Sequence, residues 1–225
     1  MRAQISVVIP TLDAEPALRS CLTALMEGLD AGLIRELVVS DGGSSDASGA
    51  VAQAWGATVL HGPPSRGGQL RRGVAAAQGD WLLIMHADTV LAPGWTDAVR
   101  DHLAHKDQAG WCRLAFDHNG MAARLVAGWA NLRSGFGLPY GDQALLIHRD
   151  LYQAVGGYPD QPLMEDVALA RALRGRMVGL DAVAVTSAVK YRRQGWLRRG
   201  ARNLWTLARY ALGVPPERLA RSYIR

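Results

Sequence analysis

Short apolar runs alternate with helix-spaced apolar patterns along the first half of the chain. Runs rich in β-branched or other apolar residues predict buried strands at residues 5–10, 36–40, 58–60 and 81–85. Between them, apolar residues that recur at helical spacing predict helices at residues 15–29, 47–55 and 68–78. Strands that alternate with helices are typical of a parallel sheet covered by helices on both faces.

The second half continues with shorter elements. Helices are predicted from just beyond Pro93 to His105 and at residues 121–132, 150–155 and 167–173. Strands are predicted at residues 111–116 and 144–148, with one or two more in 178–186. From residue 197 onward one helical apolar stripe follows, formed by Leu197, Ala201, Leu204, Ala208, Ala211 and Leu212. The pattern predicts an α/β domain over residues 1–189 and a helical extension over 190–225.

Composition narrows the class of protein. About half of the residues are apolar and a fifth are charged, which is typical of a globular chain. The only cysteines, Cys21 and Cys112, exclude a disulfide framework and a zinc site built from cysteine pairs. No apolar run approaches the ~20 residues of a membrane-spanning helix. The N-terminus also lacks the pattern of a signal peptide, so we expect a cytoplasmic protein with reduced thiols.

Three polar clusters directly follow predicted strands. They are Pro10-Thr11, Asp41-Gly42 and His86-Ala87-Asp88. In open α/β sheets, ligands bind outside the carboxyl ends of the strands, so these clusters are expected to share one site. The position of Asp41 before two glycines favours either a hydrogen bond to a closely approaching ligand or an ordinary Asx turn.

His86 and Asp88 are candidates for a metal site. Their spacing places both side chains on the same face of an extended segment. Carboxylate oxygens suit a hard divalent cation that bridges substrate phosphates, and an imidazole ligand favours manganese over magnesium. The alternative is a solvated aspartate and a histidine packed beneath the sheet, and for His86 the two interpretations are equally supported.

Two further segments carry candidate chemistry. The glycine-rich turn from Arg66 to Gln69 enters a helix, where backbone N–H groups and an arginine favour an anion. Glu165 and Asp166 open another helix, and they are either a general base or charges that suit a helix N-terminus. The chain has no dinucleotide-binding fingerprint, Walker A loop or nucleophile elbow, which argues against nicotinamide enzymes, P-loop enzymes and hydrolases of those types.

The order of these motifs resembles inverting glycosyltransferases of family 2 with the GT-A fold. Within that family it is similar to the bacterial branch described as radical-SAM/selenodomain-associated glycosyltransferases. The resemblance covers nearly the whole chain and rests on Pro10-Thr11, Asp41 to Ser44, Arg66-Gly67-x-Gln69, Ala77-x-Gly79-Asp80, His86-Ala87-Asp88, Gly141-Asp142-Gln143, Glu165-Asp166 and residues 213–219. It implies transfer of a sugar from a nucleotide-diphosphate donor, expected to be a UDP-sugar, to an acceptor hydroxyl. The implied mechanism is a metal-assisted single displacement with inversion.

The resemblance also implies residue roles. Donor binding would involve Pro10, Thr11, Asp13, Glu15, Asp41, Gly42, Arg66, Gln69 and Ala87. Asp88 would hold Mn²⁺ or Mg²⁺, with His86 standing where relatives carry the first aspartate of D-x-D. Asp166 would be the catalytic base, with Glu165 beside it. The acceptor side would hold Gly141, Asp142 and Gln143.

Two other functions stay open from the sequence. A sugar-1-phosphate nucleotidyltransferase is expected to carry a glycine-rich, lysine-bearing loop near its first strand, and residues 11–17 contain neither residue type. A non-catalytic nucleotide-sugar-binding protein on this fold is the other option. The joint presence of Asp41, Asp88 and Asp166 argues against it.

Positive charge is concentrated in the C-terminal extension. Residues 190–225 hold ten basic and one acidic residue, a net charge of +9, whereas residues 1–189 hold 15 basic and 19 acidic, a net of −4; together they give +5. A basic amphipathic helix with Trp196 and Trp205 beside its apolar stripe is also typical of peripheral contact with an anionic membrane, here the inner face of the cell membrane. The alternative is that the stripe packs on the domain and arginines reach the donor phosphates, and apolar stripes more often pack in a core than on a membrane. No nucleic-acid partner is expected.

Overall fold

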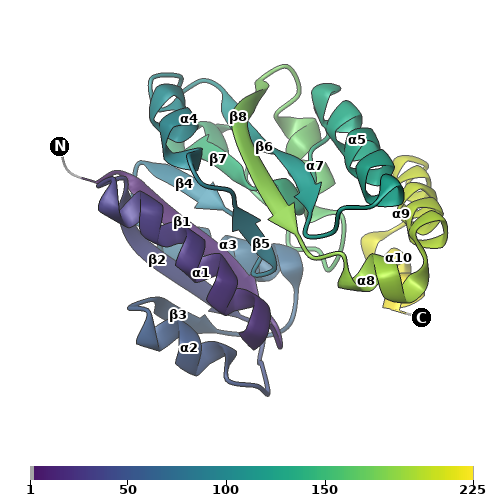
Figure 1. The fold of residues 1–225 in the computed structure, drawn as a ribbon, viewed down its shortest axis with the longest axis horizontal. Helices are drawn as coiled ribbons and strands as arrows, with labels where there is room; N and C mark the ends of the chain where they lie inside the picture. The colour runs from purple at the N-terminus through teal and green to yellow at the C-terminus, as the bar shows by residue number, and fades with distance from the viewer. Residues whose placement is uncertain (1–2, 225) are drawn as a thin grey trace.

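One mixed sheet forms the centre of the protein. The computed structural model describes residues 3–224. Eight strands pair in the order β3-β2-β1-β4-β7-β6-β8-β5 (Figure 1). Their bounds are β1 Ile5–Thr11, β2 Ile34–Asp41, β3 Thr58–His61, β4 Trp81–Ile84, β5 Thr89–Leu91, β6 Ala109–Phe116, β7 Leu145–His148 and β8 Met177–Thr186.

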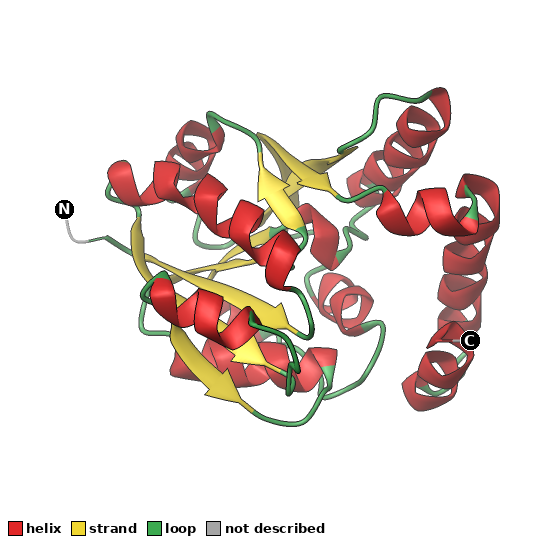
Figure 2. Cartoon of the chain, turned by 60° about the horizontal axis from the view of Figure 1, so that its bottom comes forward, coloured by secondary structure: helices red, strands yellow, loops and turns green. Residues whose placement is uncertain are grey.

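Helices cover both faces of this sheet, as expected for the predicted α/β class. Those of the domain are α1 Glu15–Asp30, α2 Ser48–Ala54, α3 Arg66–Ala76, α4 Trp95–His102, α5 Met121–Gly135, α6 Arg149–Ala154 and α7 Glu165–Ala172, with a 3-10 turn at Gly141–Gln143. The C-terminal helices are α8 Val189–Gln194, α9 Trp196–Ala211 and α10 Pro216–Ile224. They lie at the end of the molecule opposite the N-terminus (Figure 2).

The strand directions divide the sheet. β1 pairs in parallel with β2 and β4, and β2 pairs in parallel with β3. β7 then inserts antiparallel to both β4 and β6. Beyond it, β8 runs parallel to β6 and antiparallel to β5. The carboxyl ends of β1, β2 and β4 therefore meet at one edge, which places the predicted polar clusters together.

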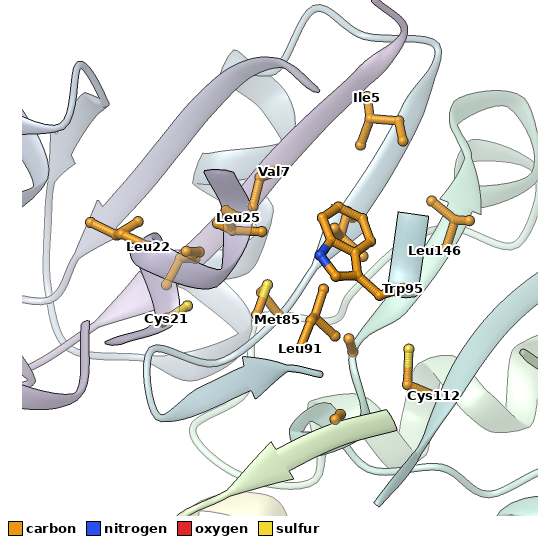
Figure 3. Packing of buried hydrophobic residues seen from close by; sticks show 14 of the residues in the cluster. Ile5, Val7, Cys21, Leu22, Leu25, Met85, Leu91, Trp95, Cys112 and Leu146 are labelled. Carbon is orange, nitrogen blue, oxygen red and sulfur yellow. The ribbon is translucent and has the colours of Figure 1, made fainter. Parts of the chain in front are cut away.

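Strand alternation divides the core between two faces. On one face, Ile5 and Val7 of β1 pack with Leu22 of α1 and Trp95 of α4 (Figure 3). On the other face, residues of β1, β4, α3, α6 and α7 pack together, among them Val8, Leu82, Leu70, Leu151 and Leu169. β1 is buried along nearly its whole length, which explains why it reads as one apolar run rather than an alternating one.

Two parts of the fold differ from the sequence-based expectation. The short strand β5 was not predicted, because Thr89–Leu91 offers only three residues of pattern between a polar loop and Pro93. The C-terminal region is three helices rather than one. Gly195 and Gly213, both at a φ of 84°, separate them, because this left-handed conformation is readily accessible to glycine but costly for other residues.

The C-terminal helices pack on the domain through a face that the apolar stripe did not predict. Leu219 of α10 is buried with Leu163, Met164 and Val167 around the start of α7, and Leu207 and Tyr210 of α9 pack against them. The predicted stripe lies instead on the exposed side of α9. Trp196 is partly buried, and its ring packs against Phe116 and Tyr191 at centroid distances of 5.1 and 5.0 Å.

Candidate active site

Two adjoining cavities lie beyond the carboxyl ends of β1 and β4. The first has a volume of about 450 Å³ and is lined by the strand ends and the loops that follow them. The second, of about 120 Å³, lies between β4, the 3-10 turn, α7 and the C-terminal helices. Their linings share five residues, which are Arg66, His86, Asp88, Ser187 and Lys190. A ligand that crosses this junction would place its phosphates among charged groups.

The first cavity contains most of the predicted donor-binding residues. Pro10, Thr11, Asp13, Arg66, Gln69 and Ala87 all line it. Gln69 fixes the strand ends, because its Nε2 donates to the carbonyls of Thr11 at 2.8 Å and Ser40 at 3.0 Å. Asp13 lies at a φ of 46°, and its Oδ1 accepts from the Ser45 N–H at 2.7 Å.

Three of the predicted donor-binding residues lie outside that lining. Asp41 is buried, and its carboxylate accepts hydrogen bonds from the N–H groups of Gly43 and Ser44, both at 2.9 Å. Burial raises the pKa of Asp41, but these hydrogen bonds and those from side-chain hydroxyls lower it by more, so the pKa lies below its ordinary value. Gly42 shares this turn, and the Glu15 carboxylate pairs with Arg19 at 3.0 Å on the surface. In this structure Asp41 therefore forms an Asx-type turn.

Lys190 joins the strand-end loop to the C-terminal region. Its Nζ lies 3.5 Å from Oδ2 of Asp88, with the Asp88 side chain about a third exposed. Burial raises the pKa of Asp88, whereas His86, Lys190 and Arg66 together lower it by more. Burial, reinforced by Arg66, lowers the pKa of His86 to about 4. At neutral pH, Asp88 is therefore a carboxylate and His86 a neutral imidazole.

These residues fit a cation that takes its other ligands from the substrate. Within residues 3–224 no group of three or more His, Cys, Asp or Glu side chains surrounds a common point. Asp88 is a single carboxylate at an open strand end, and His86 offers a nitrogen beside it. One or two carboxylates plus substrate phosphates is a usual arrangement for Mg²⁺ and also suits Mn²⁺.

Asp166 faces the second cavity from the first turn of α7. Its Oδ2 accepts a hydrogen bond of 3.0 Å from the Gly141 N–H, which orients the carboxylate. The residue at the helix N-cap, Met164, has a φ of 66°, a conformation that is strained for a residue with a side chain. The start of α7 at Glu165 and Asp166 therefore depends on a strained backbone conformation at Met164.

The two neighbouring carboxyl groups, those of Glu165 and Asp142, have raised pKa values. Glu165 is fully buried, and neither of its carboxyl oxygens has a hydrogen-bond partner within the described residues. Burial, reinforced by the charge of Asp166, raises the pKa of Glu165 to about 7. Burial also raises the pKa of Asp142 to about 6, although Asp142 lines the second cavity. Glu165 lines neither of the two cavities, whereas Asp166 lines the second, so only Asp166 of this pair can contact a ligand there.

The predicted acceptor-side residues do not all lie at the second cavity, because Gly141 and Asp142 line it and Gln143 is buried in the core. Gly141 lines the second cavity, and a Cβ at this position would collide with the His86 ring. Gln143 lies in the core, where its Oε1 accepts from the Ser134 hydroxyl at 2.6 Å and its Nε2 donates to the Cys112 carbonyl at 3.2 Å. The structure therefore places Gln143 beneath the 3-10 turn as a support rather than at the cavity.

Several lining residues come from the C-terminal helices and were missed from the sequence. They are Lys190, Tyr191, Arg199, Asn203 and Tyr223. The guanidinium of Arg199 donates to the Gln194 Oε1 at 2.7 Å and lies over the Tyr191 ring at 5.2 Å. The only signal for them was the concentration of positive charge after residue 190.

The fold and the site place two carboxylates, Asp88 and Asp166, on adjoining cavities that share the positively charged Arg66 and Lys190. A family model described as Glycosyl transferase family 2 matches residues 6–137, more than half of the chain. The chain belongs to this family. The match ends before the 3-10 turn and α7, so it covers Asp41 and Asp88 but not Asp166.

Two curated relatives match part of the chain. A TPR repeat-containing protein of Synechococcus elongatus is 34 % identical over 98 residues, which are 42 % of this chain and 23 % of the relative. A glucosyl-3-phosphoglycerate synthase of Mycolicibacterium paratuberculosis is 35 % identical over 95 residues, which are 38 % of this chain and 29 % of the relative. In each case the match spans less than a third of the relative's own length.

Solved structures share the architecture. A mannosyltransferase from Pyrobaculum calidifontis in complex with GDP-Man and Mn²⁺ superposes with a TM-score of 0.69 at 18 % identity, over 96 % of this chain and 67 % of that one. A glucosyl-3-phosphoglycerate synthase from Mycobacterium tuberculosis in complex with Mn²⁺, UDP and phosphoglyceric acid gives 0.55 at 27 % identity, over 82 % and 68 %. These likenesses confirm the GT-A fold that the sequence predicts.

Proposed function

We propose that the protein is an inverting glycosyltransferase that moves a sugar from a nucleotide-diphosphate donor to an acceptor hydroxyl. The observation that carries the proposal is the junction of the two cavities. Arg66, His86, Asp88 and Lys190 lie at this junction, and Asp166 faces the second cavity. A donor with its nucleotide in the first cavity and its sugar in the second would span the charged groups with its pyrophosphate.

The junction suits a leaving group that gains negative charge. Arg66 and Lys190 present two positive charges there, and fixed charges aimed at a developing anion stabilise the transition state. A divalent cation held by Asp88, with His86 as a candidate second ligand, would neutralise further charge on the departing nucleoside diphosphate. The metal is a proposal, and the relatives' structures with Mn²⁺ support it.

Asp166 is the proposed general base. Its Oδ2 is held by the Gly141 N–H at 3.0 Å, and it lines the second cavity together with the junction residues. From there it would take the proton of the acceptor hydroxyl as the oxygen attacks the anomeric carbon. The nucleoside diphosphate leaves from the opposite side, so one displacement inverts the configuration and needs no protein nucleophile. Glu165 does not line the cavity, which argues against it as the base.

The donor nucleotide and the branch of the family are finer proposals. We keep UDP-sugar as the proposed donor, and a relative that binds UDP supports it, whereas another relative binds GDP-Man. Membership of the radical-SAM/selenodomain-associated branch stays a prediction. A nucleotidyltransferase and a non-catalytic nucleotide-sugar-binding protein stay as alternatives, and they differ from the proposal in what they release from a nucleotide sugar.

The experiment is an end-product assay with purified protein. UDP- and GDP-sugars are incubated with a panel of hydroxyl acceptors, with and without Mn²⁺, and the released nucleotide and the glycoside are identified. We expect metal-dependent release of nucleoside diphosphate and a product of inverted anomeric configuration by NMR. Release of nucleoside triphosphate upon addition of pyrophosphate would instead indicate a nucleotidyltransferase. Tight donor binding without turnover would indicate a binding protein.

The cellular location is also a proposal. None of the helices described in residues 3–224 is long and apolar enough to span a bilayer. We propose a cytoplasmic protein that contacts the inner face of the membrane peripherally. The support is the charge of residues 190–225, ten basic against one acidic.

A further inference from the structure

Two neighbouring helices carry apolar residues on their solvent side. On α5 and at its C-terminal end these residues fall at intervals of three or four and are each more than half exposed: Met121, Leu125, Trp129, Leu132 and Phe136. The opposite side of α5, with Ala123, Ala127 and Ala130, packs on Leu114 and Phe116 of β6. The apolar side of α5 therefore has no partner among the described residues.

α9 presents a second such stripe. Leu197, Leu204, Trp205 and Leu212 are between 44 % and 88 % exposed. The inner side of α9 is the more polar one, with Arg199 and Asn203 lining the second cavity. α5 and α9 lie next to each other at the C-terminal end of the molecule (Figure 1). Monomeric proteins rarely leave so many large apolar side chains uncovered in one region, unless the region binds something.

The charge of the same region identifies the kind of partner. Residues 121–135 and 189–211 contain nine basic residues and no acidic one. Four of them are exposed arginines, namely Arg124, Arg192, Arg193 and Arg198. The other five turn to the cavity, to Tyr140 or to α10, namely Lys190, Arg199, Arg133, Arg202 and Arg209. A second copy of the chain docked face to face would bring positive charge against positive charge. An anionic lipid surface offers both the apolar layer and the opposite charge.

We infer that α5 and α9 together form a docking face for an anionic membrane surface. We call it the α5–α9 face, defined by the nine exposed apolar residues named above. Trp129 and Trp205 would lie at the level of the lipid headgroups, where tryptophan is enriched. This deepens the proposed peripheral location and assigns half of the contact to α5, outside the C-terminal extension.

The test is flotation of the full chain with lipid vesicles. Vesicles of phosphatidylcholine alone are compared with vesicles that also contain phosphatidylglycerol, at low and high salt. We expect binding only to the anionic vesicles, weakened by salt. Leu125→Gln with Trp129→Gln should reduce binding about tenfold or more, because two large apolar side chains no longer enter the interface. Arg192→Gln, Arg193→Gln and Arg198→Gln together should reduce it on the order of 100-fold at low salt.

The matched control changes a leucine and a tryptophan elsewhere on the surface. Leu29→Gln with Trp55→Gln alters partly exposed residues at the ends of α1 and α2 and should leave vesicle binding unchanged. Thermal melting of each variant shows whether it folds. Wild-type protein that does not float with anionic vesicles at low salt would overturn the inference. Equal vesicle binding by the α5 double variant and the control double variant would also overturn it. If wild-type protein is a dimer and the α5 double variant is a monomer, the face serves self-association instead.

Vesicle binding and catalysis are measured separately. Nucleoside diphosphate release without vesicles reports on the proposed reaction alone. A protein that binds vesicles but transfers no sugar would contradict the proposed function and leave the docking face standing. A protein that transfers sugar but does not bind vesicles would contradict only the docking face.

Discussion

The ammonium group of Lys190 lies 3.5 Å from the carboxylate of Asp88. Asp88 follows the central strand β4, and Lys190 belongs to α8, more than a hundred residues later in the chain. This contact ties the C-terminal helices to the proposed metal ligand. It also gives Asp88 a positive partner.

Replacement of Asp88 tests the metal site. Asp88→Asn should abolish metal-dependent donor binding with little change in the free energy of unfolding, because the side chain is about a third exposed and its one ion pair is accessible to solvent. Calorimetric titration of UDP with and without Mn²⁺ measures the first effect, and thermal melting the second. Asp150→Asn, on the surface at the start of α6, is the control. An Asp88→Asn protein with unchanged manganese-dependent affinity would exclude Asp88 as the ligand.

Lys190 can either bind the donor phosphates or compete with the cation for Asp88, and one variant distinguishes these two roles. If its ammonium binds the donor phosphates, Lys190→Met should weaken metal-dependent UDP binding roughly tenfold, as for the loss of a charged hydrogen bond. We expect this result, because Lys190 lines both cavities. Stronger manganese binding by the variant would show that the lysine mainly competes with the cation for Asp88. Titration of UDP at several manganese concentrations distinguishes the two.

The buried Glu165 predicts a pH dependence of stability. In the folded protein its pKa is about 7, against an ordinary value of 4.5, so between these values the folded state holds a proton that the unfolded chain has lost. Stability therefore falls as the pH rises through this window. Glu165→Gln resembles the protonated form and should gain stability relative to wild type at pH 8, by up to about 3 kcal/mol, with the difference vanishing near pH 4.5.

Denaturant unfolding of the ligand-free proteins across this pH range measures the effect. Asp166→Asn in the same series is informative, because the charge of Asp166 contributes to the raised pKa of Glu165. It should shift the pH dependence of stability to lower pH. A Glu165→Gln protein whose stability follows the same pH curve as wild type would show that Glu165 is ionised in the fold.

The sequence predicted the strand ends well because the relevant pattern is local. A buried run that stops at Thr11, Asp41 or Met85 shows both the strand and the polar residues after it. Parallel pairing then brings such ends together without further information. The Asp41 carboxylate shows the limit of this reasoning, because the same local turn supplies its hydrogen-bond donors and keeps it out of the cavity lining.

The C-terminal helices could not be predicted in the same way. Amphipathic patterns are normally read with the apolar side inward. In α9 the more polar side faces the cavity, with Arg199 and Asn203, and the stripe that includes Leu197 and Trp205 faces solvent. Only the tertiary structure shows that the cavity supplies the partners of the polar side.

The central claim is that Asp166 removes the acceptor proton in the second cavity, beside its junction with the first. The most direct measurement is single-turnover sugar transfer by wild type, Asp166→Asn and Glu165→Gln, with donor affinity determined for each. Asp166→Asn should bind the donor normally and lose roughly 10²–10⁴-fold in rate, the usual contribution of a general base, whereas Glu165→Gln should retain most of the rate. If Asp166→Asn turns over at nearly the wild-type rate while Glu165→Gln does not, the base is Glu165 and the proposed site geometry is wrong.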